Sequence, residues 1–308
     1  MATAQAIHPR THAADFRLGV LLVAGAAIAW SFGGTIARFI NEPDAWTVVF
    51  WRSLFAASFL LLFMLWREGP QATVRMFRAM GWPGLGVACC FGIASSSFVV
   101  ALQHTTVANI LLIQAAAPLF AALLAWAVFR ERVNLATWIA IAAVIGGVSI
   151  MVSASFSGQV SPVGDGLALL ITVLFSAAIV ITRHHPEVRM TPAVCLGTAM
   201  ACIAAFFLSG GLAVAAPDLF WLVMFGAVNL GAGLAMFVTG ARLVPAALAA
   251  LVSTLEPVLG PVWVWLIHGE VPMPRTIIGG AIVFVALLIH ILNDWRRQRE
   301  RRRSTPRA

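Results

Sequence analysis

Charged residues are scarce in this sequence. They make up 10% of its 308 residues, whereas apolar residues make up 61%. A water-soluble domain of this length needs more polar surface than so few charges supply. The apolar residues instead gather in ten long stretches, and a stretch of about 20 apolar residues matches the hydrocarbon thickness of a bilayer. The sequence therefore predicts an integral membrane protein.

The patterns that mark metal centres, disulfide frameworks and catalytic sites are also missing. The four cysteines, Cys89, Cys90, Cys195 and Cys202, lie inside apolar runs without the spacing of metal ligands. The sequence has no His-Glu-x-x-His, no Gly-x-Ser-x-Gly, no glycine-rich phosphate loop and no pair of intramembrane aspartates. We therefore expect no catalytic residue, no metal and no cofactor, and a membrane enzyme is disfavoured.

The long apolar runs predict helices, because lipid offers no hydrogen bonds and each span must satisfy its own backbone. We expect an all-α integral membrane fold with ten transmembrane helices. They lie near residues 18–38, 46–66, 83–103, 106–129, 136–154, 165–183, 191–213, 219–241, 246–268 and 275–293. The preceding residues 1–17 lack the apolar region of a cleaved signal peptide and are predicted to be a cytoplasmic segment.

The arginines are distributed unevenly between the two sides of these helices. The side that carries both termini holds Arg10, Arg17, Arg67, Arg75, Arg78, Arg130, Arg132, Arg183, Arg189, Arg242 and the seven arginines of the tail 295–308. The other side receives only Arg38 and Arg275. By the positive-inside rule both termini are cytoplasmic. The net charge of +8 therefore indicates contact with the lipid bilayer and not with nucleic acid.

The sequence also contains an internal repeat. A shift of 139 positions aligns residues 94–131 with 233–270 without a gap and pairs Pro118 with Pro257, Trp126 with Trp265 and Glu131 with Glu270. Residues 18–157 and 158–294 then form two five-helix repeats. Because five is odd, the second repeat enters the membrane from the opposite face, which makes the repeats inverted. This architecture is typical of carriers that open a midplane site to one side and then to the other.

Short motifs in both halves resemble those of a known family. They are Ala29-Trp30-Ser31-Phe32-Gly33, Arg52, Pro118-Leu-Phe-Ala-Ala leading to Phe129-Arg-Glu131, and Leu255-Glu256-Pro257-Val258 leading to Gly269-Glu270. Over residues 18–292 the sequence is similar to the drug/metabolite transporter superfamily and, within it, to EamA-type ten-helix carriers. Its length, ten spans and arginine-rich tail further resemble a bacterial exporter of aromatic amino acids. The resemblance implies a carrier of the bacterial inner membrane.

Polar and aromatic side chains at membrane depth are the candidate substrate-binding residues. Glu256 either binds a substrate ammonium group or couples transport to protons, unless it only bonds a neighbouring helix beside Pro257. The other candidates are Gln114, Asn229 and Ser96 as polar anchors and Trp30, Phe98, Phe175 and Phe237 as walls for a ring-bearing substrate. Arg52 either snorkels to the outer interface, pairs with a carboxylate or binds a substrate carboxylate.

Proline and glycine suggest where the helices bend and pack. Pro118, Pro257 and Pro261 each remove an intrahelical hydrogen bond, so they are candidate hinges; the alternative, which membrane helices slightly favour, is a fixed bend that only shapes the bundle. The pairs Gly146-Gly147 and Gly279-Gly280 in spans five and ten allow close helix approach. They predict either a contact within the bundle or a homodimer seam.

The leading functional prediction is a secondary transporter. It exports small amphipathic metabolites, with aromatic and other neutral amino acids suggested by the resemblance, across the cytoplasmic membrane by alternating access. The alternatives are other cargo such as lipophilic cations or drugs, and a pore-like facilitator or channel, which needs a continuous polar path.

Overall fold

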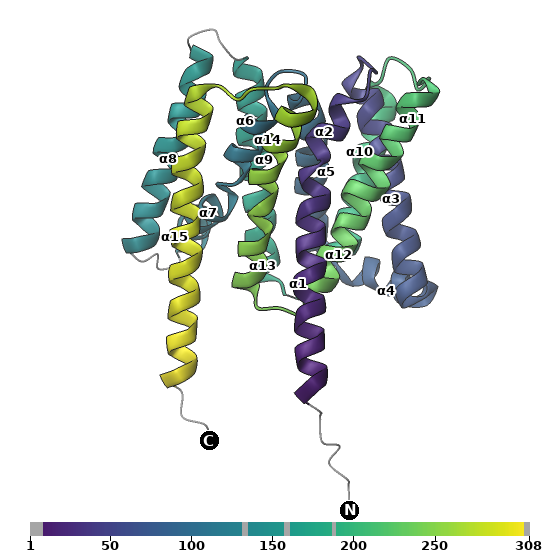
Figure 1. Ribbon diagram of the computed structural model, residues 1–308. Coiled ribbons are helices and arrows are strands. Elements are labelled where there is room, and N and C mark those ends of the chain that lie inside the picture. Colours follow the sequence, from purple (N-terminus) through teal and green to yellow (C-terminus); the bar gives the residue numbers. More distant parts are fainter. Residues whose placement is uncertain (1–8, 131–134, 157–160, 187–188, 305–308) are drawn as a thin grey trace, which may run out of the picture.

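The fold is a bundle of helices that cross a membrane. The computed structural model describes residues 9–130, 135–156, 161–186 and 189–304 (Figure 1). Within these ranges every regular element is a helix. Among the described residues, nine helices are long and apolar enough to span a membrane, and the pair α6 and α7, bent by 41°, makes a tenth span when it is taken as one. The all-α, ten-helix fold predicted from the sequence is confirmed.

Each predicted span corresponds to one helix or to an interrupted one. The first half contains α1 (Pro9–Ser31) with α2 (Gly33–Arg38), α3 (Ala45–Glu68), α5 (Gly81–Ala101), α6 (Val107–Gln114) with α7 (Ala117–Phe129), and α8 (Leu135–Phe156). The second half contains α9 (Pro162–His184), α10 (Met190–Leu208), α11 (Ala216–Val223) with η1 (Met224–Ala232) and α12 (Gly233–Gly240), α13 (Ala246–Ser253) with α14 (Leu255–His268), and α15 (Pro274–Ser304).

Three features at the helix ends differ from the predicted spans. A short helix that the hydropathy did not indicate, α4 (Pro70–Ala79), lies between α3 and α5. Helix α1 begins within the predicted N-terminal segment 1–17, and α15 continues into the basic tail 295–308 as an unbroken helix. The predicted repeat boundary between residues 157 and 158 lies outside the described residues.

The start of α1 and the end of α15 lie at the same end of the bundle, as an even number of spans requires (Figure 1). We call this the terminal end. The opposite end, which carries α2, the loop between α5 and α6 and the loop after α14, is the far end.

The two repeats are most alike at the interrupted helices of spans four and nine. The bounds of α6 and α13 differ by the same 139 residues that align the two halves of the sequence. The residues that follow α7 and α14, Arg130 and Gly269, keep this spacing and are both left-handed, with φ of 53° and 70°. From the far end, α6 leads to α7, whereas α13 leads to α14 from the terminal end (Figure 1). The repeats are therefore inverted.

Glycines of spans five and ten form a contact within the chain. Helices α8 and α15 pack side by side, and a Cβ at Gly147 would lie 2.7 Å from the carbonyl oxygen of Gly279. Small residues at such a crossing let two backbones approach closely. Gly146 has no atom within 4 Å of the position of a Cβ. A homodimer through these spans stays a prediction.

Candidate functional site

A cavity of about 230 Å³ lies in the middle of the bundle, between the two repeats. Seven of the eight predicted substrate-binding residues line it: Glu256, Gln114, Asn229, Trp30, Phe98, Phe175 and Phe237. They come from α14, α6, η1, α1, α5, α9 and α12. Residues more than 200 positions apart in the sequence therefore meet in one cavity, which we call the central cavity.

Aromatic rings form much of the wall of the central cavity. Trp30 packs against Phe237 with ring centroids 5.3 Å apart, and Phe91 packs against Phe175 at 6.0 Å. The indole nitrogen of Trp30 is buried and has no hydrogen-bond partner among the described residues. The cavity therefore offers flat apolar surfaces with few polar groups, as small-molecule sites generally do.

Two polar residues of the cavity lie where a spanning helix is interrupted. Gln114 is the last residue of α6, and Glu256 is the second residue of α14. Neither side chain forms a hydrogen bond with the described part of the chain, although both are only partly exposed. A carboxylate and an amide that stay unpaired at membrane depth are costly unless water or a ligand satisfies them. Both groups are therefore free to bind a ligand.

Asn229 lines the cavity but also fastens two helices together. Its amide nitrogen donates to the carbonyl oxygens of Ala29 at 2.6 Å and of Trp30 at 3.3 Å. Both carbonyls lie next to the interruption of the first span between α1 and α2, where that of Ala29 also accepts from the N–H of Phe32 at 3.3 Å. Asn229 lies in η1, a π-helical segment, and such segments are frequent at functional sites. Its donor capacity is thus largely used by the protein.

Ser96 lies outside the central cavity, which differs from the sequence-based expectation. Its hydroxyl donates to the carbonyl oxygen of Gly92 at 2.9 Å, and it lines a separate groove beside α10. The preceding residue, Ser95, lines the central cavity instead. Successive residues of an α-helix point about 100° apart, so adjacent serines face different surroundings. The sequence Ser95-Ser96-Ser97 alone does not indicate which of the three serines faces the cavity.

Arg52 lies in the wall of the cavity and does not snorkel to the interface. It is 6% exposed, and its Nη1 donates to the hydroxyl of Ser95 at 2.7 Å. Its guanidinium carbon lies 4.3 Å from the ring centroid of Phe225. No carboxylate of the described residues forms an ion pair with it. Of the three predicted roles, snorkelling and pairing with a carboxylate are therefore not observed.

The predicted hinge prolines lie at helix interruptions and not at simple kinks, with one exception. Pro118 is the second residue of α7 and Pro257 the third of α14, so each follows a break in its span. A proline near the start of a helix costs little, because the first N–H groups lack an intrahelical acceptor. Pro261 lies inside α14, which continues through it. The role of these residues as hinges stays a prediction.

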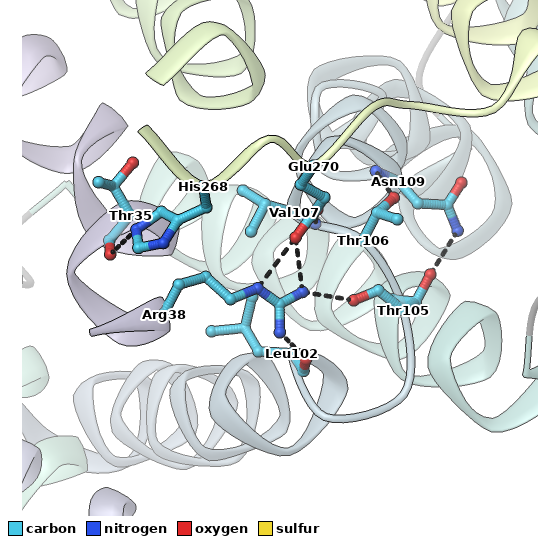
Figure 2. A network of polar contacts seen from close by, with 9 residues as sticks. All are labelled: Thr35, Arg38, Leu102, Thr105, Thr106, Val107, Asn109, His268 and Glu270. Carbon is cyan, nitrogen blue, oxygen red and sulfur yellow. Dashed lines mark hydrogen bonds and ion pairs between the residues drawn. The ribbon is translucent and has the colours of Figure 1, made fainter. Parts of the chain in front are cut away.

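A network of polar contacts joins helix ends and loops at the far end of the bundle. Arg38 forms an ion pair with Glu270 at 2.9 Å and donates to the carbonyl oxygens of Leu102 at 2.7 Å and Thr105 at 3.2 Å (Figure 2). Glu270 also accepts from the backbone N–H of Val107 at 2.7 Å, at the start of α6. The network joins α2, the loop between α5 and α6 and the loop after α14, so it connects both repeats.

The residues that line the central cavity lie at different depths between the far end and the terminal end. Phe98 and Arg52 lie on its far-end side, whereas Val87, Val194 and Phe237 lie closer to the terminal end of their helices. A larger groove of about 420 Å³ between α8 and α15 holds none of the predicted site residues and is lined mostly by alanine and isoleucine. The central cavity is therefore the candidate site.

Comparison with known proteins identifies the family. The sequence profile of the EamA-like transporter family matches the chain twice, over residues 17–153 and 162–292. The chain belongs to the EamA-like transporter family. This membership, within the drug/metabolite transporter superfamily, assigns it to membrane transport of small molecules. The two matches also agree with the two repeats.

A similar fold occurs among the solved structures. One crystal structure matches this transporter with a TM-score of 0.63 and 18% sequence identity. The match covers 90% of this chain and 98% of the other chain. At this identity the likeness shows the fold alone. A search of curated proteins found no match.

Proposed function

We propose that this transporter exports small amphipathic metabolites, with aromatic and other neutral amino acids as its cargo, across the inner membrane of a bacterial cell. Both termini are cytoplasmic in this proposal, in accordance with the excess of arginines at the terminal end. The two inverted repeats move against each other, so that the central cavity opens to one side and then to the other.

One observation carries the proposal: Glu256 lies without a hydrogen-bond partner among the described residues, in a cavity otherwise walled by aromatic rings. A substrate with an ammonium group satisfies the carboxylate, and a ring-bearing side chain packs against Trp30, Phe98, Phe175 and Phe237. The cavity volume of about 230 Å³ is below the range of about 300–1,000 Å³ for drug-sized ligands. Size therefore favours an amino acid over a large drug.

The test is counterflow in liposomes that contain the purified full-length protein. Labelled L-phenylalanine is expected to enter vesicles preloaded with unlabelled L-phenylalanine, with saturable kinetics. Glu256→Gln removes the charge and keeps the shape, so its counterflow should fall at least tenfold, because a charged hydrogen bond contributes about 1.5–3 kcal/mol. Full-rate counterflow by a well-folded Glu256→Gln variant would contradict the assigned role of the carboxylate.

The same carboxylate and rings also suit a lipophilic cation, which is the second candidate cargo. A cation binds the faces of aromatic rings as well as a carboxylate. The liposome panel therefore includes a lipophilic cation and is run with and without a pH gradient. Flux of the cation in the absence of amino-acid flux would replace the amino-acid proposal, and single-channel currents in place of counterflow would indicate a pore.

A further inference from the structure

The central cavity contains one buried positive charge that the described residues do not neutralise. Arg52 is 6% exposed and comes from α3, in the first repeat. The rings of Phe225 and Phe98, with centroids 4.3 and 5.8 Å from its guanidinium carbon, stabilise the cation in part. An ionised group in such surroundings is costly unless a counter-charge and hydrogen bonds accompany it. The site is therefore incomplete without an anion.

The hydrogen bonds of Arg52 leave one edge of its guanidinium free. Both of its hydrogen bonds use Nη1, which donates to the hydroxyl and to the carbonyl oxygen of Ser95 at 2.7 and 3.3 Å. Nε is buried without a partner, and Nη2 forms no hydrogen bond with the described residues. A carboxylate binds the paired nitrogens of one guanidinium edge with two parallel hydrogen bonds. The free edge thus has the donors that a carboxylate requires.

The opposite charge in the same cavity is unpaired as well. Glu256 comes from α14, in the second repeat, and forms no ion pair with Arg52 or with another described residue. Two charges of opposite sign thus line one cavity without meeting. A ligand that carries both a carboxylate and an ammonium group supplies the counter-charge that each of them lacks.

We propose that Arg52 binds the carboxylate of a zwitterionic cargo while Glu256 binds its ammonium group. This inference rests on the proposed function and adds to it that the amino-acid cargo must carry a free carboxylate. Arg52 is then a specificity-determining residue that rejects amines of the same shape. Because the two charges belong to different repeats, the cargo also bridges the halves that move against each other.

Three ligands with the same ring test the proposal by calorimetry on the purified full-length protein. L-phenylalanine carries both charges, 2-phenylethylamine lacks the carboxylate, and 3-phenylpropionate lacks the ammonium group. The wild-type protein should bind L-phenylalanine about tenfold to hundredfold more tightly than 2-phenylethylamine, the range of one charged hydrogen-bonded contact. This comparison needs no variant, so it does not depend on whether a substitution at Arg52 folds.

The variants then locate the two contacts. Arg52→Gln should weaken the binding of L-phenylalanine about tenfold to hundredfold and leave the affinity for 2-phenylethylamine unchanged. The affinity of Arg52→Lys for L-phenylalanine should lie between those of the wild type and Arg52→Gln, because lysine keeps the charge without the paired nitrogens. Glu256→Gln should lower the affinity for both L-phenylalanine and 2-phenylethylamine and leave the affinity for 3-phenylpropionate unchanged.

The outcomes separate this inference from the proposed function. If the protein carries out counterflow of L-phenylalanine and Arg52→Gln still prefers L-phenylalanine over 2-phenylethylamine as the wild type does, the role of Arg52 is overturned but the amino-acid carrier stands. Tighter binding of 2-phenylethylamine than of L-phenylalanine by the wild type would also overturn the role of Arg52. Binding of none of the three ligands would remove both proposals.

Discussion

Removal of the ion pair at the far end should open the central cavity to that side. The change is Arg38→Gln, which keeps a long polar side chain but eliminates the charge that holds Glu270 and the two carbonyl groups of Leu102 and Thr105. These contacts connect both repeats, so in the proposed alternating-access cycle they form only while the far end is closed. Their loss therefore raises the population of the state that is open at this end.

The size of the shift follows from the contacts that are lost. The side chains of Arg38 and Glu270 are 30% and 19% exposed, so solvent screens the pair and its contribution is about 1 kcal/mol. The charged hydrogen bonds to the carbonyl groups add about 1–2 kcal/mol after competition with water. A total of about 2–3 kcal/mol changes the ratio of open to closed states about 30- to 150-fold.

A thiol placed beside Arg38 measures this ratio. Val99 is 4% exposed, follows the cavity residue Phe98 on α5, and lines a pocket of about 260 Å³ together with Arg38. In a cysteine-free background, Val99→Cys should react with a membrane-impermeant maleimide about 30- to 150-fold faster when Arg38→Gln is present. Arg275→Gln is the matched control, because Arg275 also lies at the far end but bonds only Ser153 on α8 among the described residues. Equal labelling rates with and without Arg38→Gln would refute the closing role of this ion pair.

Two further predictions use neighbouring residues as matched pairs. Gly147→Leu should lower the free energy of unfolding by about 2 kcal/mol or more, since its Cβ would lie 2.7 Å from the carbonyl oxygen of Gly279. Gly146→Leu should change this free energy little, because no atom lies within 4 Å of its Cβ position. Thermal unfolding in detergent measures both variants. Ser95→Ala should weaken L-phenylalanine binding severalfold by releasing the guanidinium it holds, and Ser96→Ala should not; equal effects in calorimetry would count against the assignment of these two serines.

The helices and their repeat could be predicted from the sequence because lipid leaves few choices. Every spanning segment must bond its own backbone, so the long apolar runs became helices at nearly the predicted residues. The repeat was predicted from the equal spacing of Pro118 and Pro257 and of Glu131 and Glu270. The structure shows the corresponding interruptions in spans four and nine. Several cavity residues, such as Glu256 and Gln114, were also found from polarity alone, because a polar group at membrane depth rarely faces lipid.

Side-chain direction was decided only by the tertiary structure. The sequence did not distinguish Ser95 from Ser96, did not reveal that Asn229 bonds the carbonyls of the interrupted first span, and left three roles open for Arg52. In a soluble protein a polar stripe marks the outer face of a helix, but here lipid is as apolar as the protein interior. The sequence therefore determined which segments cross the membrane and how they repeat, whereas packing between helices decided which faces enclose the central cavity.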